Sequence, residues 1–286
     1  MVSFGAQVDF AVPHIKIKNL NKHYDVQGTP VHALKNINLD IPEGKIFGII
    51  GKSGAGKSSL IRTLNGLESI SGGSIHIHQQ DLSRLNHAEL IQLRQRMGMI
   101  FQHFNLMSAK TVRENVALPL KVAGCSAAEI APRVNEALQL VGLTEKADHY
   151  PSQLSGGQKR AVAIAGVLAM HPDVLILDEP SDALDPGARR RLIHLLQTFE
   201  HTKIIATHDL DLVLDVCTRV IVLHEGRILA DAHPLEVFAD AALLARASLE
   251  KPLSLQPRGC YAYDLPATPL AVDGPPGVAR PSPGLD

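Results

Sequence analysis

The stretch GKSGAGKS at residues 51–58 constrains the fold of this chain more than any other feature. It fits the pattern G-x-x-x-x-G-K-[ST], follows an apolar run of strand length at 45–50 and precedes helical apolar spacing at 59–65. In a strand, glycine-rich loop and helix of this order, backbone N–H groups turn toward an anion and the helix N-terminus adds positive potential. Lys57 is then placed to reach the β and γ phosphates of a nucleotide, and Ser58 to offer its hydroxyl to Mg²⁺. The pattern predicts an α/β nucleotide-binding core.

The composition is that of an ordinary globular protein and excludes several classes of function. The 286 residues are 45% hydrophobic and 20% charged, and 28 basic residues balance 29 acidic ones, so no nucleic-acid partner is expected. There is no apolar run of the roughly 20 residues that a membrane helix needs, and no secretory signal, so we expect a cytoplasmic protein. Three widely spaced cysteines, Cys125, Cys217 and Cys260, suit a reducing compartment and argue against a cysteine metal framework.

Polar side chains follow three further apolar runs, each at the point where a predicted strand ends. Gln102 ends the run at 97–102, Asp178 and Glu179 follow the run at 174–177, and His208 follows the run at 203–207. The carboxyl ends of strands in an open α/β sheet form the edge where ligands bind. There Asp178 can hold Mg²⁺ through its water shell, Glu179 can polarise a water as general base, His208 can donate to the transferring group, and Gln102 can coordinate a cation or orient a water. Taken singly, each has a structural alternative: a solvent-facing glutamine, a helix cap and a structural histidine.

Outside this core the pattern changes twice. Alternating residues at 14–18 and 31–41 predict a small antiparallel layer, and Tyr24 lies between these strands, where its ring can stack on a base or simply pack. Residues 103–165 predict a helical insertion, with helices at 112–123, 127–141 and 158–170. Within it, Leu154-Ser-Gly-Gly-Gln158 offers backbone donors and a hydroxyl at a helix start, which is either a second anion site or an isolated cap. From residue 252 the chain is rich in proline and glycine, which predicts disorder.

Taken together and in this order, the motifs resemble the nucleotide-binding subunit of an ABC transporter. The resemblance covers about residues 14–250, with the helical subdomain at about 103–165 and a Pro/Gly-rich tail at 251–286. It implies an α/β fold: a P-loop NTPase core with a mostly parallel sheet, an N-terminal antiparallel β layer and an inserted helical subdomain.

The resemblance also implies a role for each motif. Tyr24 would stack on adenine, 51–58 would be the Walker A loop, 154–158 the signature motif, and Asp178 the Walker B aspartate. The catalytic residues would be Glu179 as base, His208 as switch histidine and Gln102 of the Q-loop, and Mg²⁺ would be held by Ser58, Gln102 and Asp178. The residues implied to bind ATP are Tyr24, Gly51, Ser53, Gly54, Ala55, Gly56, Lys57, Ser58, Ser59, Ser155, Gly156, Gly157 and Gln158.

The partners implied are a second copy of the chain, or a paralogous ATPase, and integral membrane permease subunits. Two copies would close head to tail, so that Ser155 and its neighbours cap the γ-phosphate bound by the other copy's Walker A loop. We therefore expect a peripheral location on the cytoplasmic face of the inner membrane, with solute uptake powered by ATP hydrolysis.

The two halves of the chain resemble different subfamilies. The segments HALKNINL at 32–39, SISGGSI at 69–75 and IFQHFNLM at 100–107 are similar to methionine importers, whereas AGVLAMHP at 165–172 and THDLDLVLD at 207–215 are similar to cobalt and nickel uptake ATPases. Methionine uptake, or uptake of a related amino acid, is the first hypothesis, and cobalt or nickel uptake is the alternative. Methionine importers usually carry a C-terminal regulatory domain, and 251–286 is too short and proline-rich to form one, so we expect no feedback inhibition of that type.

Two positions depart from the family pattern. KRAV stands at 159–162 where Lys-Gln-Arg-Val is usual, which moves the arginine by about 100° around the helix and threatens its ion pair. Asp182 stands where serine is common and would bring a negative charge to the dimer seam. We expect slower hydrolysis rather than none.

Two other classes of function are weaker alternatives. A non-transport ABC protein acting on ribosomes or DNA commonly has two nucleotide-binding domains or long coiled coils, and this chain has one copy of each motif and no sustained heptad. A regulatory module without hydrolysis is disfavoured because Lys57, Asp178, Glu179 and His208 are all present.

Overall fold

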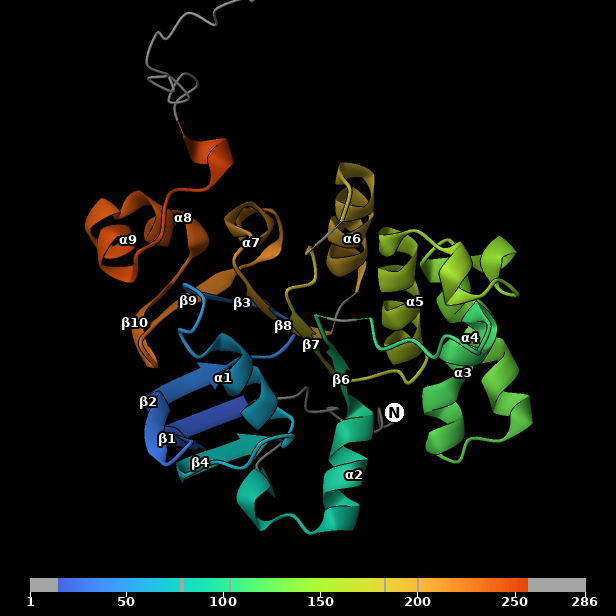
Figure 1. The fold of residues 1–286 in the computed structure, drawn as a ribbon, viewed down its shortest axis with the longest axis horizontal. Helices are drawn as coiled ribbons and strands as arrows, with labels where there is room; N and C mark the ends of the chain where they lie inside the picture. The colour runs from blue at the N-terminus through green and yellow to red at the C-terminus, as the bar shows by residue number, and fades with distance from the viewer. Residues whose placement is uncertain (1–14, 78–79, 103, 183, 200, 257–286) are drawn as a thin grey trace, which may run out of the picture.

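Two β-sheets with helices around them make up the computed structural model of the chain, which describes residues 15–77, 80–102, 104–182, 184–199 and 201–256 (Figure 1). One sheet has four antiparallel strands in the order β2-β1-β4-β5, and the other has six in the order β10-β9-β3-β8-β7-β6. The strands are β1 (Ile15–Val26), β2 (Thr29–Ile41), β3 (Ile46–Ile50), β4 (Gly72–Ile77), β5 (Gln80–Asp81), β6 (Met97–Ile100), β7 (Val174–Asp178), β8 (Thr202–Thr207), β9 (Arg219–His224) and β10 (Arg227–Ala232).

The helices of the described residues cover the larger sheet and fill the space between the sheets. They are α1 (Lys57–Leu64), α2 (His87–Arg96), α3 (Val112–Val122), α4 (Ala127–Leu140), α5 (Gly156–Leu168), α6 (Pro186–Thr198), α7 (Leu210–Val216), α8 (Pro234–Ala239) and α9 (Ala241–Ala247), with short 3-10 turns η1 (Leu82–Arg84), η2 (Thr144–Lys146), η3 (Pro151–Gln153) and η4 (Leu253–Leu255).

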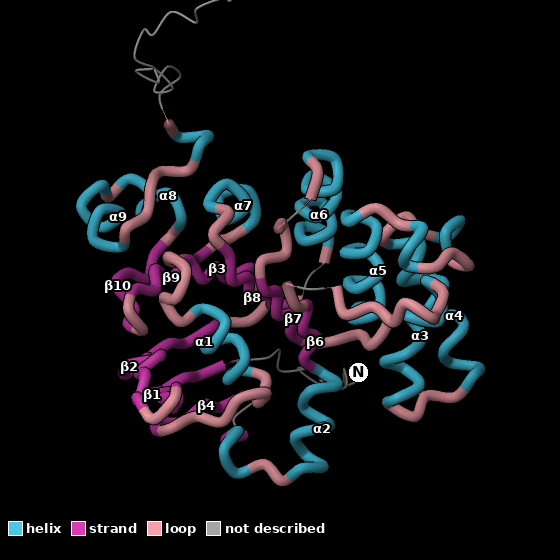
Figure 2. Tube along the Cα trace, in the orientation of Figure 1, coloured by secondary structure: helices cyan, strands magenta, loops and turns pink. Residues whose placement is uncertain are grey.

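Strands β9, β3, β8, β7 and β6 are mutually parallel, and β10 is antiparallel to β9. Every residue of β7 and of β8 is buried, as expected for central parallel strands that are covered on both faces. Helix α1 lies between the two sheets in Figures 1 and 2, and its Leu60, Ile61 and Leu64 belong to the core that also contains Ile15 and Ile49. The helix after the glycine-rich loop is therefore fixed from both sides.

Helices α3, α4 and α5 pack around a core of their own, to one side of the larger sheet (Figure 2). Each begins with a capping box: Thr111 with Glu114, Ser126 with Glu129, and Ser155 with Gln158. Such boxes satisfy backbone N–H groups that have no partner inside the helix. The described residues thus contain three apolar cores, one of which is confined to the helical region.

The fold confirms the predicted α/β class with a mostly parallel sheet, an antiparallel β layer and a helical region, but several boundaries differ. Tyr24 lies inside β1 and pairs with Val31, not between two strands. Strand β6 ends at Ile100, so Gln102 follows it by two residues, and α5 begins at Gly156 instead of residue 158. The first residues of the predicted tail include η4, whose Leu253 and Ser254 N–H groups donate to the Asp211 carboxylate at 3.0 Å each.

Some predictions fall on residues that the structure does not describe. These are Cys260 and the part of the Pro/Gly-rich tail at 257–286. Within the described ranges, no helix combines the length and the apolar character that crossing a membrane requires.

Candidate nucleotide site

The sheet order brings four predicted site segments to one edge. Strands β3, β8, β7 and β6 are neighbours and run parallel, so the residues that follow them meet at the carboxyl edge of the sheet. The glycine-rich loop follows β3, Asp178 and Glu179 end β7, His208 follows β8, and Gln102 follows β6. This is the edge at which ligands bind in open α/β sheets.

The glycines of the loop are required by close packing as well as by backbone conformation. Gly56, the N-cap of α1, has φ 107°, and a Cβ built there would lie 2.7 Å from the carbonyl oxygen of Ala33. A Cβ at Gly51 would lie 2.2 Å from the carbonyl oxygen of Leu223. Gly54 has φ 80° with open space around it, and Ala55 is buried beneath the loop at 5% exposure. The two ends of the loop, at Gly51 and Gly56, pack closely against the core, whereas Ser53 and Gly54 in its middle are exposed to solvent.

Lys57, Glu179 and His208 form one connected group at the sheet edge. The Lys57 Nζ donates to the Gly51 carbonyl oxygen at 2.7 Å and lies 3.8 Å from Glu179 Oε1. Glu179 Oε2 accepts from the backbone N–H of His208 at 3.0 Å and lies 2.8 Å from His208 Nδ1. Glu179 itself has φ 48°, a left-handed conformation that is costly for a residue with a side chain and often marks functional sites. The carboxylate is thereby held between a lysine and a histidine.

Ser58 and Asp178 form the second pair of the site. Ser58 Oγ donates to Asp178 Oδ1 at 3.3 Å, and Asp178 is only 4% exposed. Burial raises the pKa of the Asp178 carboxyl above its usual value, and the neighbouring Glu179 adds to the rise, while the Ser58 hydroxyl opposes it. A buried carboxylate with one hydroxyl partner has oxygen lone pairs to spare, and hard cations such as Mg²⁺ prefer such oxygens.

Tyr24 is held by its hydroxyl, which contacts Ser59 in the first turn of α1 and Glu68 in the segment after that helix. That hydroxyl donates to the carboxylate of Glu68 and is hydrogen-bonded to the Ser59 hydroxyl at 3.0 Å. The Lys22 Nζ lies 4.7 Å from the centre of the Tyr24 ring, and it also lies 3.9 Å from Glu68. Burial raises the Tyr24 pKa, and the hydrogen bond to Glu68 adds to the rise. Two of the residues that hold the Tyr24 side chain, Lys22 and Glu68, are not singled out by the sequence.

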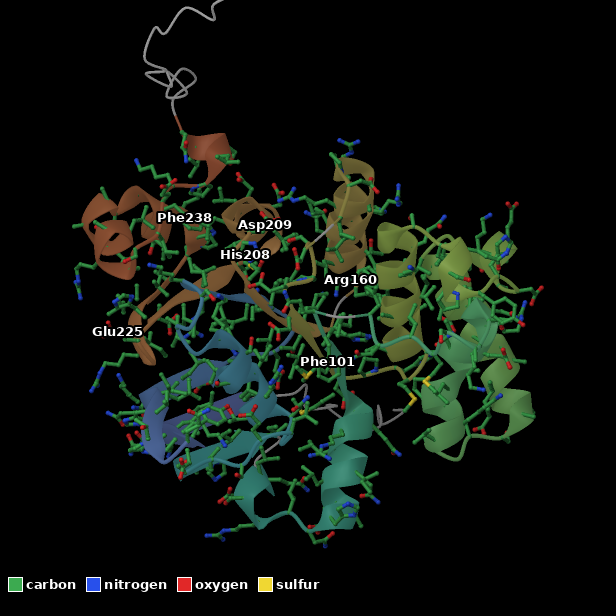
Figure 3. All side chains as sticks on the ribbon, in the orientation of Figure 1. Phe101, Arg160, His208, Asp209, Glu225 and Phe238 are labelled. Atoms are coloured by element: carbon green, nitrogen blue, oxygen red, sulfur yellow. The ribbon has the colours of Figure 1, made fainter. Side chains whose placement is uncertain are left out.

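Gln102 is linked to two residues from other loops. Its side-chain Nε2 donates to Asp182 Oδ2 at 3.3 Å, and its backbone carbonyl oxygen accepts from Arg160 Nη2 at 3.0 Å. Arg160, labelled in Figure 3, is 2% exposed and donates from Nη1 to the Phe101 carbonyl oxygen at 2.7 Å. Its guanidinium carbon lies 5.0 Å from the centre of the Phe104 ring. Burial lowers the pKa of Arg160, and the charge of Asp182 opposes that change. The displaced arginine therefore has two backbone carbonyl oxygens and one aromatic ring as partners. None of these groups is charged, so the loss of an ion-pair partner stays a prediction.

The Ser155–Gln158 turn is exposed and bonded to itself. Ser155 Oγ accepts from the Gln158 N–H at 3.2 Å, and Gln158 Oε1 accepts from the Ser155 N–H at 3.0 Å. The start of α5 is well separated from α1 in Figure 2, with β6 and β7 between them. The structure thus brings together the predicted site residues after β3, β6, β7 and β8, and leaves this turn apart from the loop of its own chain.

Four residues of the site region were missed or read differently from the sequence: Lys22, Glu68, Arg160 and Asp182. Lys22 and Glu68 lie on either side of the loop helix in the chain and carry no motif, and only their contact with Tyr24 reveals them. Arg160 and Asp182 were visible only as departures from a family pattern. Their charges were visible in the sequence, but their shared contact with Gln102 was not.

Comparison with known proteins decides the family. The family model of ABC transporters matches residues 34–182, more than half of the chain. This chain belongs to the ABC transporter family. A methionine import ATP-binding protein of Acinetobacter baylyi is 56% identical over 265 residues, which cover 89% of this chain and 74% of that protein. The methionine import ATP-binding protein of Desulfitobacterium hafniense is 50% identical over 226 residues, covering 78% of this chain and 66% of the relative.

Solved ABC structures share the fold. A dimeric ATP-binding cassette in a post-hydrolysis state with ADP and Pi is 34% identical, with a TM-score of 0.72 over 77% of this chain and 98% of that one. CbiO1 from Clostridium perfringens, described as part of an ABC transporter complex, is 37% identical with a TM-score of 0.71, covering 81% of this chain and 93% of its own. The chain is an ATP-binding ABC-type ATPase with the P-loop NTPase fold.

Proposed function

We propose that this ABC ATPase powers the import of methionine or a related amino acid, with one half of each catalytic site on each of two copies. The observation that supports this chemistry is the position of the Glu179 carboxylate at the end of β7. Its Oε2 lies 2.8 Å from His208 Nδ1, and its Oε1 lies 3.8 Å from Lys57 Nζ. A carboxylate in such a position is suited to take a proton from a water that attacks a phosphoryl group.

In this mechanism the glycine-rich loop binds the phosphates of ATP through its backbone N–H groups. The phosphate oxygens offer Lys57 better acceptors than the Gly51 carbonyl oxygen and the Glu179 carboxylate that it contacts in this structure. Glu179 is then available to the attacking water. It accepts the proton as the water oxygen bonds to the γ-phosphorus and ADP leaves, while His208 orients the carboxylate and stabilises the transferring group. Tyr24 offers its ring face to adenine.

The residues present fit a magnesium ion. Ser58 and Asp178 would hold it, the latter through water, with Gln102 as a third oxygen donor from the end of β6. When bound, Mg²⁺ would neutralise charge that develops on the β and γ phosphates.

A second copy of the chain, or a paralogous ATPase, would complete the site. The Ser155–Gln158 turn offers a helix N-terminus and exposed donors with no phosphate loop of its own chain to serve, which suits the γ-phosphate on a partner. Head-to-tail pairing with C2 symmetry gives two such sites per dimer. Membrane permease subunits, contacted near Gln102 and the helical region, would place the ATPase on the cytoplasmic face of the inner membrane.

Sequence similarity supports methionine as the solute. Two relatives named for methionine import are 56% and 50% identical to this chain. Co-purification of the chain with its membrane partner, followed by uptake of labelled methionine and of ⁶³Ni²⁺ or ⁵⁷Co²⁺ in vesicles, tests the assignment. Uptake of the metal ion without uptake of methionine would reverse it.

The Glu179→Gln variant tests the catalytic proposal. The amide keeps the shape of the side chain but is no general base, so hydrolysis should fall by about 10²–10⁴-fold while ATP still binds. The variant should therefore accumulate as an ATP-bound dimer in sizing chromatography with light scattering. A variant that stays monomeric with ATP and Mg²⁺ would contradict the two-copy site, and one that hydrolyses ATP normally would contradict the role of Glu179.

A further inference from the structure

Gln102 is held from two sides by residues that lie far from it in the chain. Arg160 of α5 fixes its backbone through the carbonyl oxygens of Phe101 and Gln102, and Asp182, in the loop after β7, accepts from its side-chain amide. Asp182 is itself joined to the catalytic segment, because its N–H donates to the Glu179 carbonyl oxygen at 3.2 Å. Gln102, Arg160 and Asp182 also line a common cavity of about 440 Å³.

An ionised carboxylate has a specific effect on a neighbouring glutamine amide. The amide group has a donor end, NH₂, and an acceptor end, the carbonyl oxygen, and these ends are nearly equal in shape. A carboxylate only accepts hydrogen bonds, so it can pair only with the NH₂ end, whereas serine or asparagine can pair with either end. The contact between Gln102 Nε2 and Asp182 Oδ2 at 3.3 Å therefore selects one of the two amide orientations. In that orientation Oε1 is the end left to accept hydrogen bonds or bind a cation.

We propose that Asp182 is a positioning residue that selects the amide orientation of Gln102, so that Gln102 Oε1 is presented to Mg²⁺ and the attacking water. This inference rests on the proposed role of Gln102. Asp182 is not a lone negative charge, because the buried guanidinium of Arg160 faces the same cavity. The inference reverses the expectation from sequence: Asp182 supports hydrolysis, and replacing it should slow the reaction.

The test compares the full-length chain with Asp182→Asn and Asp182→Ser, which remove the fixed acceptor with little or no increase in volume. Either substitution removes the preference for one amide orientation, which is expected to be worth about as much as one hydrogen bond between neutral groups. The value of kcat should therefore fall about three- to tenfold. The Mg²⁺ concentration for half-maximal rate should rise by a similar factor, while the affinity for a fluorescent ATP analogue measured in EDTA should stay unchanged. A variant that merely loosens the fold would lower nucleotide affinity and thermal stability together. Asp148→Asn, a matched charge change at an 88% exposed side chain, is the control.

The Gln102→Ala background separates this inference from the proposed function. If Asp182 acts through Gln102, Gln102→Ala lowers the rate and Asp182→Asn has no further effect on it. Two results overturn the inference and leave the proposed role of Gln102 intact. In the first, Gln102→Ala is impaired but Asp182→Asn or Asp182→Ser hydrolyses ATP at or above the wild-type rate. In the second, Asp182→Asn lowers kcat by the same factor in the wild-type chain and in Gln102→Ala. A Gln102→Ala protein with the wild-type rate and Mg²⁺ dependence instead overturns the proposed role of Gln102, and the inference with it.

Discussion

The edge of the parallel sheet and the turn at the start of α5 carry the two halves of the proposed chemistry, and they are built in opposite ways. At the sheet edge, contacts between side chains join segments that are far apart in the chain: Glu179 with His208 and with Lys57, and Ser58 with Asp178. At the turn, Ser155 and Gln158 are bonded to each other across a single helical turn.

The difference teaches which half can act alone. The sheet edge needs the whole α/β core to assemble, and once assembled it has the residues for nucleotide binding. The turn is closed by hydrogen bonds between its own residues, and its exposed Ser155 and Gly156 can meet another molecule. Changes at the edge should therefore act within one chain, and changes at the turn should act between chains.

The largest expected effect at the turn comes from Ser155→Asp. Aspartate is as good an N-cap as serine, so α5 and the thermal stability should be preserved. In a closed dimer the new carboxylate would face the γ-phosphate of the partner, and hydrolysis should fall by at least about 100-fold. Ser155→Asn, which also caps but carries no charge, should lose much less. Steady-state ATPase rates and nucleotide affinity of the monomer measure the two effects, and reduced monomer affinity would place the turn in its own chain's site.

Mixing Ser155→Asp with Lys57→Ala sharpens that result. Each homodimer is defective, but half of the randomly formed dimers contain one of each chain, and these have one fully intact composite site. About a quarter of the wild-type rate should return on mixing. If no activity returns while mixed dimers are shown to form by light scattering with differently tagged chains, the division of the site between two copies is refuted.

His208→Ala should give a smaller loss, because it removes one partner of Glu179 and not the base itself. A hydrogen bond to a charged group contributes about 1.5–3 kcal/mol, which corresponds to a decrease in kcat of roughly 10- to 100-fold. Nucleotide affinity should be retained, since His208 is absent from the phosphate loop. The side chain of His208 is 68% exposed, so the fold should tolerate the change. A loss as large as that of Glu179→Gln would show that His208 does more than orient the carboxylate.

The sequence predicted the sheet edge well and the loops around it poorly, for physical reasons. Buried strands leave a strong signal, because four consecutive apolar residues in β7 and three in β8 are followed by polar ones. The sequence predicts only the first part of β1, because register shifts between Ile17 and His23 interrupt the alternation of apolar and polar residues. Tyr24 therefore falls outside the predicted strand although it lies in the observed one. The bond between Gln102 and Asp182 joins residues 80 positions apart through two loops. No local pattern encodes such a contact, which depends on how the helical region packs against the sheet.

Substitutions of Tyr24 test whether its ring or its hydroxyl contributes to ATP binding. Tyr24→Ala removes the ring proposed to stack on adenine, which should raise the KM for ATP about tenfold, because stacking of a base contributes about 1–3 kcal/mol. Tyr24→Phe keeps the ring but loses the bonds to Glu68 and Ser59, so its KM should change less than about threefold. Kinetics with GTP provide the control for base preference. Equal effects of the two substitutions would assign the role of Tyr24 to its hydroxyl instead of its ring.

The smallest expected effect is a pair of opposite shifts in stability at two carboxylates of the edge. Burial and Glu179 raise the pKa of Asp178, so its ionised form destabilises the folded chain, and this cost appears as pH rises through the unfolded and then the folded pKa. Hydrogen bonds from Arg189 and from the Leu212 N–H outweigh burial and lower the pKa of Asp209, so Asp209 stabilises the fold above its unfolded pKa and loses that contribution as pH falls through the folded pKa.

Without nucleotide at pH 7, Asp178→Asn should therefore raise Tm and Asp209→Asn should lower it. In a chain of this size, Tm shifts by about 2–4 °C for each kcal/mol of change in the free energy of unfolding. Both differences should shrink in acid, where the wild-type carboxyls are protonated. Calorimetry from pH 7 down to about pH 2 measures the shifts, because the pKa of Asp209 in the folded chain lies below the ordinary value of 3.8. Adding ATP and Mg²⁺ should stabilise the wild-type chain more than Asp178→Asn, because an amide is a poorer partner for the cation. A destabilised Asp178→Asn without ligand would mean that the fold, and not only the ligand, requires the buried charge at the end of β7.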